Sequence, residues 1–419
     1  MATSRDFQTM LNEYLPIELL KAEMQKRDYL LQRAEMDDGW KGGNLVVPFE
    51  GQNASSVEFG QLAADTDISK YKYVRGGISV QPEVWGTMRF EHRDLMEHDG
   101  KIPEKTFLKI LPNQIDDFLT NMKMVVSVNM MNGLHFATAT VNGTVGGVLE
   151  VDRIDRLSID QKVVLDDGDS SPVTAYVIAI DVNGGTLKNG AVTLSATRGG
   201  AALDISAYTV SQVARLYHPG AQANSFTSLK GQLLSLANGG TATIFGQTKT
   251  SYPYLQAVQV DGSAISATNV LAKIFDGYTR RQILGKGGAA PEVLMSLKHF
   301  GSCMKIIETQ KGGFNIVPNS RKVSQYGYDT IEIGTVAGQV LKLVGIQEMD
   351  DDAIMLLDWS TVTVHSNGMF KRRTAPDGKQ YFEVRSTAGY AYILDHCFFG
   401  DVVCKAPWKN AIIYSIPNY

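Results

Sequence analysis

The sequence is poor in cysteine and has no long apolar run. Its 419 residues include three cysteines, Cys303, Cys397 and Cys404, and none belongs to a CxxC pair. An odd and small number of this kind cannot form the disulfide framework of a secreted protein, so a reducing compartment fits best. No apolar stretch reaches the ~18 residues of a membrane helix, and the first residues lack the apolar core of a signal peptide. We expect a soluble protein that is made in a cytoplasm and does not bind a membrane.

An excess of charge of one sign is lacking too. The net charge is −4 with a pI near 6.0, which excludes the basic signature of a nucleic-acid-binding protein for the chain as a whole. Hydrophobic residues make up 44% and charged residues 20%, as in ordinary globular proteins. Forty glycines against thirteen prolines indicate many turns and favour β structure.

The motifs of common catalytic sites are missing. The sequence has no Walker A loop, no GxSxG nucleophile elbow and no HExxH pair. The glycine-rich stretch 143–147 lacks dinucleotide-site spacing and is predicted to be a turn. Cys303 is predicted to be a buried residue of a helix. Adjacent strand residues face opposite sides, so Cys397 and the preceding His396 do not predict a catalytic dyad. We expect no cofactor.

Three charged clusters allow more than one interpretation each. His92 and His98 stand among carboxylates up to Asp99 and form the densest His–carboxylate cluster. It is interpreted either as a metal or hydrolase site or, preferably, as a solvated loop end. The run 166–169 is either a calcium loop or, as favoured, a tight β-turn. The acidic run 350–352 suits a cation, a basic neighbour or, by default, a solvated loop.

The first part of the chain predicts a helical arm and a ribbon. Apolar residues recur at helical spacing on both sides of Pro16. This arm would pack either on its own domain or on a neighbouring subunit. From residue 44 onward, short extended runs flank the polar stretch 50–70, which predicts a long two-stranded ribbon. An isolated ribbon is marginal in water, so we expect it to find a partner on another chain.

The rest of the chain alternates between helices and strands. Residues 113–132 form the clearest helical pattern, with Pro112 before it and Gly133 after it. Four strand candidates at 161–165, 175–182, 191–196 and 208–213, separated by turn clusters, predict a small barrel or sandwich. Two helices are then expected, over 269–284 and from Pro291 to about 309, followed by strands. Residues 269–322 carry nine basic and three acidic residues, which face either nucleic acid or solvent.

This order of parts resembles the HK97-type major capsid protein fold of tailed bacteriophages. The resemblance covers nearly the whole chain and rests on order and lengths, since no signature motif exists. It implies an α+β fold with five parts. These are an N-terminal arm (1–43), an extended β-ribbon loop (44–102), a spine helix with the start of a peripheral domain (103–149), an inserted small β domain (150–222), and an axial domain with the return strands of the peripheral domain (223–419).

The resemblance further implies a structural protein and not an enzyme. It would self-assemble as pentamers and hexamers into an icosahedral head that encloses double-stranded DNA by non-specific contact. It would be assembled in a bacterial cytoplasm and reside in the virion. The short arm suggests a separate scaffolding protein, and portal and decoration proteins are further implied partners. Aromatic residues of the ribbon region would supply intersubunit contacts, namely Phe49, Phe59, Tyr71, Tyr73, Trp85 and Phe90.

Three alternatives stay open. An encapsulin-like nanocompartment would share the fold and enclose a protein cargo in place of DNA. A mixed-β hydrolase would place its site near His92 and Asp99. A monomeric binding module would use residues 150–220 to hold a glycan and would not form particles.

Overall fold

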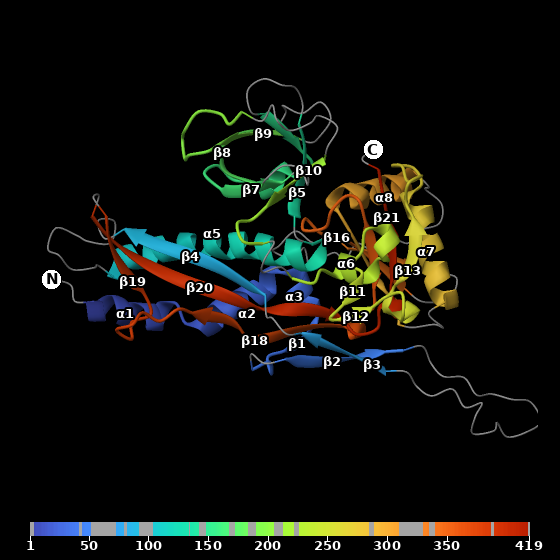
Figure 1. Cartoon of the computed structure of the whole chain (residues 1–419), viewed down its shortest axis with the longest axis horizontal. Coiled ribbons are helices and arrows are strands. Elements are labelled where there is room, and N and C mark those ends of the chain that lie inside the picture. Colours follow the sequence, from blue (N-terminus) through green and yellow to red (C-terminus); the bar gives the residue numbers. More distant parts are fainter. Residues whose placement is uncertain are drawn as a thin grey trace, which may run out of the picture. The chain divides into compact units, whose positions relative to one another are not determined.

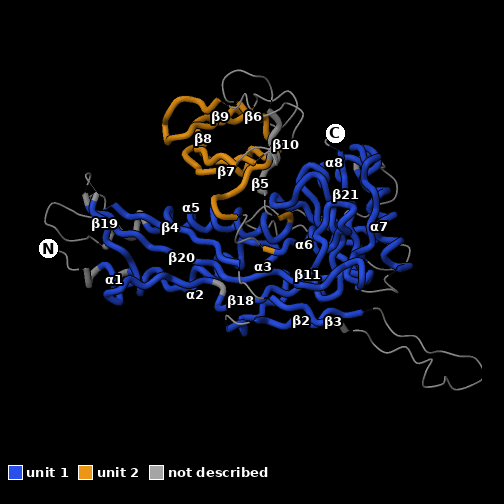
Figure 2. Tube along the Cα trace, in the orientation of Figure 1, with its two compact units in different colours: residues 1–131, 227–419 blue, residues 132–226 orange. Residues whose placement is uncertain are grey.

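The computed structural model divides the chain into two compact units (Figure 2). Unit 1 comprises residues 1–131 and 227–419, and unit 2 comprises residues 132–226. The structure describes residues 4–41, 44–51, 73–78, 82–91, 104–133, 135–141, 148–166, 172–182, 190–204, 213–221, 226–284, 289–309, 330–334, 340–386 and 389–417. The two units are described separately below.

Unit 1 begins with the predicted helical arm. The arm consists of α1 (Ser4–Tyr14), α2 (Ile17–Arg27) and α3 (Tyr29–Arg33). Pro16 precedes α2 with φ −66°, as its ring requires, and the Asp28 carboxylate caps α3 by accepting from the Leu31 amide at 3.1 Å. The apolar stripe of the arm is buried in unit 1, and α2 packs against α5 and β18. Of the two arrangements expected for the arm, the described residues adopt the one on their own unit.

The predicted ribbon is present as a hairpin whose base is anchored. Strands β2 (Leu45–Glu50) and β3 (Tyr73–Ile78) pair antiparallel, while the polar tip 52–72 lies outside the described residues. Val47 and Phe49 are buried in a small core with Trp40 and Ile244. The expectation that the ribbon has no partner in its own unit is therefore wrong for its base. Strand β3 covers residues 73–78 of the extended run that follows the polar stretch.

The long helix α5 (Glu104–Met131) starts earlier than predicted. Pro112 lies inside it, although proline removes one helical hydrogen bond. The helix is stabilised by a buried face that includes Phe118 and Met122, which pack against strand β4 (Glu83–Glu91). The approach is close, because a Cβ added at Gly86 would lie 2.6 Å from atoms of both side chains. Only glycine allows this distance.

The helix α5 lies along a five-stranded sheet, visible in Figure 1. Its order is β1-β18-β20-β19, with β4 also paired to β20. The ribbon expected over 44–102 therefore ends early, since β4 belongs to this sheet. The remaining strands are β1 (Glu35–Asp37), β18 (Val362–Arg372), β19 (Phe382–Ser386) and the long β20 (Gly389–Cys404).

A second sheet of unit 1 has six strands and two covering helices (Figure 1). Helix α7 (Val270–Leu284) packs on β13 and β21, and α8 (Leu297–Thr309) packs on β16. The strands follow the order β13 (Val258–Asp261), β21 (Ala411–Tyr414), β17 (Ile354–Leu357), β14 (Glu292–Met295), β16 (Val340–Gly345) and β15 (Thr330–Gly334). Short elements complete the unit, namely α6 (Leu229–Leu233), β11 (Thr243–Ile244) and β12 (Gln247–Thr248).

One of the two predicted helices of this region is correct and the other is partly wrong. Helix α7 confirms the helix predicted over 269–284. The helix expected from Pro291 is preceded by a central strand, β14, whose Val293, Leu294 and Met295 are fully buried. A short continuous apolar run suits either a helix or a strand buried on both faces. Its pairing with β16 and β17 decides for a strand.

Unit 2 is a closed six-stranded barrel. Its strands are β5 (His135–Val141), β6 (Val148–Val151), β7 (Lys162–Asp166), β8 (Val173–Asp181), β9 (Gly190–Ser195) and β10 (Val213–Tyr217), closed in the order β10-β5-β6-β9-β8-β7. Alternate residues such as Leu149, Val163 and Leu194 fill its interior. Strands β7, β8 and β9 confirm three predicted strands. The unit begins at residue 132 because β5 and the start of β6 precede residue 150. Strand β10 begins at Val213, and residues 208–212 of the strand expected at 208–213 lie outside the described residues.

Candidate assembly surfaces

The structure separates the six aromatic residues expected at intersubunit contacts. Phe49 and Phe90 are buried, with exposed fractions of 0% and 2%. Their rings are already packed inside unit 1, so we correct the expectation that they offer surface to a neighbour. Phe59 and Tyr71 lie outside the described residues, as does the side chain of Tyr73. Trp85 has 51% of its surface exposed.

Trp85 lies on an open face of the five-stranded sheet. Along β4, Glu83, Trp85, Thr87 and Arg89 are exposed, while the alternate residues face α5 and the arm. The Trp85 ring packs edge-on against Phe399 of β20, with centroids 6.3 Å apart. Its indole N–H donates to the Glu83 carboxylate at 3.2 Å. The indole is thus held in place and still half exposed.

Cations cover other rings on the same face. The Lys371 ammonium lies 5.2 Å from the Phe399 ring centroid, and the Arg373 guanidinium lies 4.9 Å from that of Phe382. Such cation–π contacts shield aromatic rings from water on a surface. Trp85 has no such cover among the described residues. It is the aromatic residue of this face that is best placed to contact another molecule.

Further apolar side chains are exposed elsewhere in unit 1. Val46 of the hairpin has an exposed fraction of 58%, and Ile283 and Leu284 at the end of α7 reach 71% and 57%. These residues belong to elements other than the β4 sheet. In unit 2, Ile159 and Val182 are exposed by 64% and 65%. Scattered single apolar residues are normal on a surface, so a candidate contact needs a second feature beside it.

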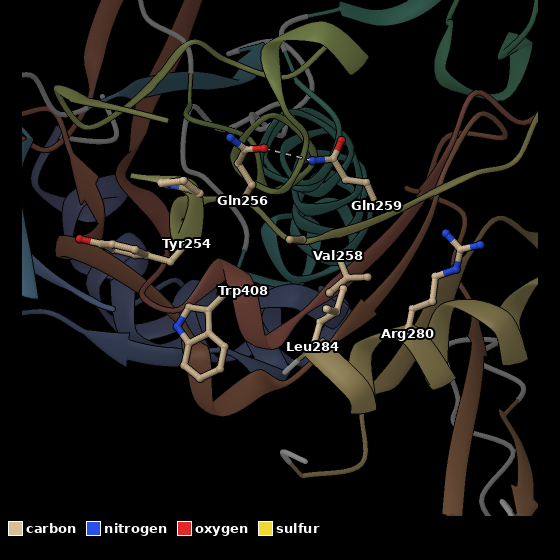
Figure 3. A pocket seen from close by; sticks show the side chains of 9 residues that line it. Tyr254, Gln256, Val258, Gln259, Arg280, Leu284 and Trp408 are labelled. Carbon is tan, nitrogen blue, oxygen red and sulfur yellow. Dashed lines mark hydrogen bonds between the residues drawn. The ribbon is translucent and has the colours of Figure 1, made fainter. Parts of the chain in front are cut away.

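A pocket provides that feature at the end of α7 (Figure 3). It has a volume of about 420 Å³ and is formed by a 3₁₀ turn (Pro253–Leu255), β13, α7 and a second 3₁₀ turn (Pro407–Lys409). Trp408 and Tyr254 lie on one side, Leu284 and Arg280 on the other. The remaining lining residues are Pro253, Gln256, Ala257, Val258 and Gln259.

The polar side chains at the pocket differ in how firmly they are held by neighbouring residues. Gln259 is held by Ser235 at 3.1 Å and Asn238 at 2.6 Å, so it forms a fixed wall. Arg280 reaches one ion-pair partner among the described residues, Asp276, through its Nε at 3.1 Å. The Arg280 side chain is 54% exposed. The pocket is therefore mainly apolar with a cation at its rim.

A partly buried carboxylate ties the arm to the six-stranded sheet. Glu292 of β14 accepts hydrogen bonds from the Tyr29 hydroxyl at 2.7 Å and from the Trp359 indole at 2.6 Å. Lys342 and Arg33 pair with it at 3.1 and 3.0 Å. Burial would raise the pKa of Glu292, but the Tyr29 hydrogen bond and the two cations hold it below its usual value.

Two buried carboxylates, in contrast to Glu292, have raised pKa values. Asp28 accepts from the Ser127 hydroxyl of α5, and burial raises its pKa to about 6. Asp401 of β20 accepts from the amides of Thr227 at 3.0 Å and Val402 at 2.9 Å, and burial raises its pKa to about 7. Neither carboxylate stands in the pocket, and both join segments that are distant in sequence. Their roles are structural.

The residues considered for catalysis or metal binding fall into two groups. The cluster from His92 to Asp99 lies outside the described residues, and so do 167–169. Within the described part of the chain, no three His, Cys, Asp or Glu side chains could hold a metal ion together. Cys303 and Cys397 are buried, as predicted for Cys303. The His396 ring is enclosed, and burial together with Arg372 lowers its pKa to about 3.

The described residues of the charged runs form ion pairs and hydrogen bonds within the chain. Lys230 of α6 pairs with Asp352 at 2.6 Å and with Asp350 at 3.9 Å, so the acidic run has a basic neighbour. In the basic stretch 269–322, Arg281 is buried and donates to the Lys409 carbonyl at 2.6 Å. Residues 285–288 and 310–329 are not described. Lys273, Arg280, Lys298 and Lys305 are the described bases of this stretch that keep surface.

Sequence reasoning missed the pocket and the Glu292 cluster. Both join side chains from elements far apart in the chain, and no local pattern marks them. The exposure of Trp85 did leave a signal, since it alternates with apolar residues and shares its side with charged ones. Among the described helices, none has the length and apolar character of a membrane span.

Comparison with known proteins finds shell proteins among solved structures. No protein-family model matches the chain, and no curated protein does. The capsid asymmetric unit of cyanophage A-1(L) is 9% identical, with 92% of each chain covered and a TM-score of 0.47. The capsid of a native GTA particle is 11% identical over 93% of this chain and 90% of that one, with a TM-score of 0.45. The holo-SrpI encapsulin complex from Synechococcus elongatus is 9% identical over 93% and 89%, with a TM-score of 0.39.

These three are shell proteins, the class that the order of elements in the sequence resembles, and each covers more than nine-tenths of this chain. Their TM-scores lie below 0.5, so the similarity is coarse. The function proposed below rests on the chain's own residues.

Proposed function

We propose that this chain is the subunit of a closed protein shell, the major capsid protein of a phage head that encloses double-stranded DNA. The observation that carries the proposal is the distribution of exposed apolar surface in unit 1. Trp85 lies beside Glu83 on the sheet face, and Leu284 lines the pocket at the end of α7. Each exposed apolar residue has a second feature beside it, and the two lie on different elements. A subunit of a shell touches several neighbours at once and needs several such places.

A simple dimer would need fewer exposed contact surfaces. A two-fold dimer uses one self-complementary patch, whereas rings and shells are built from contacts between unlike surfaces of the same chain. The described elements occur in the order arm, anchored hairpin, long helix with sheet, barrel, and sheet with two helices. This order supports rings of five or six copies, with the hairpin extending to a neighbour. The mechanism is assembly through many weak contacts and needs no catalytic group.

The proposed DNA contact is modest. Lys273, Lys298 and Lys305 keep surface on α7 and α8, and basic side chains hold phosphates without reading sequence. We expect release of bound nucleic acid as salt is raised. The buried Arg281 does not take part.

Electron microscopy of the purified chain, with sedimentation over a range of concentration and salt, tests the proposal. Closed particles or free rings of five or six are expected, with nuclease-protected DNA in particles isolated from infected cells. Particles that enclose a protein cargo and no DNA would favour the nanocompartment. A chain that remains monomeric even with a candidate scaffolding protein would refute the shell function.

A further inference from the structure

We propose that the pocket at the end of α7 receives Trp85 of a second copy of this chain. The inference deepens the proposed shell function and rests on it, because it names one of the contacts that would join neighbouring subunits. Both surfaces belong to unit 1, on different sheets. The contact would be heterologous, with the pocket of one copy facing the β4 sheet of the next.

The pocket has the size and chemistry for an aromatic anchor. Its volume of about 420 Å³ lies within the ~300–1,000 Å³ of ligand-binding pockets. Trp408, Tyr254 and Leu284 give it apolar walls. Leu284 is 57% exposed, so a partner that covers it removes apolar surface from water. An indole is a large side chain that loses little conformational freedom on binding.

Charge selects Trp85 among the exposed apolar residues. The rim of the pocket carries Arg280, a half-exposed cation whose one ion-pair partner among the described residues is Asp276. Its ligand should therefore bring a carboxylate next to an apolar group. Trp85 does so, since Glu83 accepts from its indole N–H at 3.2 Å. Among the described residues, Tyr390 is the other exposed large aromatic side chain. Its ring centroid lies 4.9 Å from the Arg385 guanidinium, a cation that would repel Arg280.

Preorganisation favours the same pair. The Trp85 ring packs against the Phe399 ring, with the two centroids 6.3 Å apart. Gln259 is fixed in the pocket wall by two hydrogen bonds. Neither side needs to reorganise much on contact, which lowers the cost of association. Buried tryptophan and arginine residues are the usual centres of binding energy at interfaces.

Complementation between two variants tests this contact. Trp85→Ala removes the anchor and Leu284→Glu blocks the pocket, and each is expected to weaken ring formation by at least about 30-fold. Because the contact is head-to-tail, a mixture of the two retains a single intact interface and should stop at dimers. Tyr390→Ala and Ile283→Glu are the matched controls, since Tyr390 carries the wrong charge beside it and Ile283 is exposed but does not line the pocket. Both should assemble as the wild type does.

Charge reversal and crosslinking supply readouts that do not depend on loss of assembly. Glu83→Arg and Arg280→Glu should each weaken assembly, and the double variant should restore it. All three native cysteines are buried, so oxidation of a mixture of Thr87→Cys and size-tagged Ile283→Cys chains should give mixed covalent dimers. These positions lie beside Trp85 and beside the pocket, and both the anchor and the pocket lining stay intact. A Tyr390→Cys and Ile283→Cys mixture should give fewer.

The outcomes separate the two proposals. A wild type that forms rings or shells, with variants that assemble equally well and no mixed disulfide, would overturn the inference and leave the shell function standing. A wild type that forms no assembly under any condition would refute the shell function, and this contact with it.

Discussion

Replacing Glu292 with glutamine should loosen the contact between the arm and the six-stranded sheet of unit 1. The carboxylate accepts bonds from Tyr29 and Trp359 and pairs with Arg33 and Lys342, all within 3.1 Å. A glutamine keeps the shape but loses the charge, and its NH₂ group faces donors. Removing one partner of a buried ion pair costs about 3–5 kcal/mol. The Arg33 side chain is 38% exposed and that of Lys342 24%, so solvent screens part of the loss, and we expect about 2–3 kcal/mol.

Denaturant unfolding under conditions without assembly measures this loss, with Glu13→Gln on the exposed side of α1 as a control. The pH dependence gives a second test. The folded pKa of Glu292 lies below its usual value, so its contribution is present above the unfolded pKa and is lost as pH falls through the folded one. The difference between wild type and Glu292→Gln should therefore shrink in acid. Tryptic cleavage at Lys21 and Arg27 should also become faster. Equal stability of both proteins at neutral pH would refute the reasoning.

Three further changes give expected outcomes. Asp401→Asn should reduce the pH dependence of stability, because burial raises the pKa of Asp401 to about 7. Between pH 4 and pH 8 the wild type should lose about 2–4 kcal/mol of stability relative to the variant. Parallel stability curves of the two proteins would contradict this. Gly86→Ala should destabilise unit 1 by about 1–3 kcal/mol in thermal unfolding, because the new Cβ would lie 2.6 Å from Phe118 and Met122. The control Gly77→Ala should be nearly neutral, because a Cβ at Gly77 meets nothing within 4 Å. Asp28→Asn should likewise stabilise the arm above pH 6 relative to the wild type, since burial raises the pKa of Asp28 to about 6, and hydrogen exchange in α3 would report the change.

Local patterns predicted the elements that stand alone and failed where pairing decides. The arm helices and α7 have apolar residues at helical spacing and clear end signals, and they were found. The residues of strand β14 were predicted to begin a helix, because Val293 to Met295 is a short apolar run that follows a proline. Helix α5 passes through Pro112, since packing of its later turns on β4 outweighs one missing hydrogen bond. The pocket and the Glu292 cluster depend on contacts between distant segments, which no local window contains.

The sequence of β4 holds more information on the assembly surface than its aromatic content suggests. Successive strand residues face opposite sides, so Trp85 and Phe90, five positions apart, cannot both face a neighbour. Phe90 shares its side with Met88 and Gly86, and all three pack inward or against α5. Trp85 shares its side with Thr87 and Arg89, which face solvent. Trp85 stays half exposed although Phe399 and Glu83 contact it, and its place on the polar side of the strand selects it as the residue whose replacement should affect assembly and not folding.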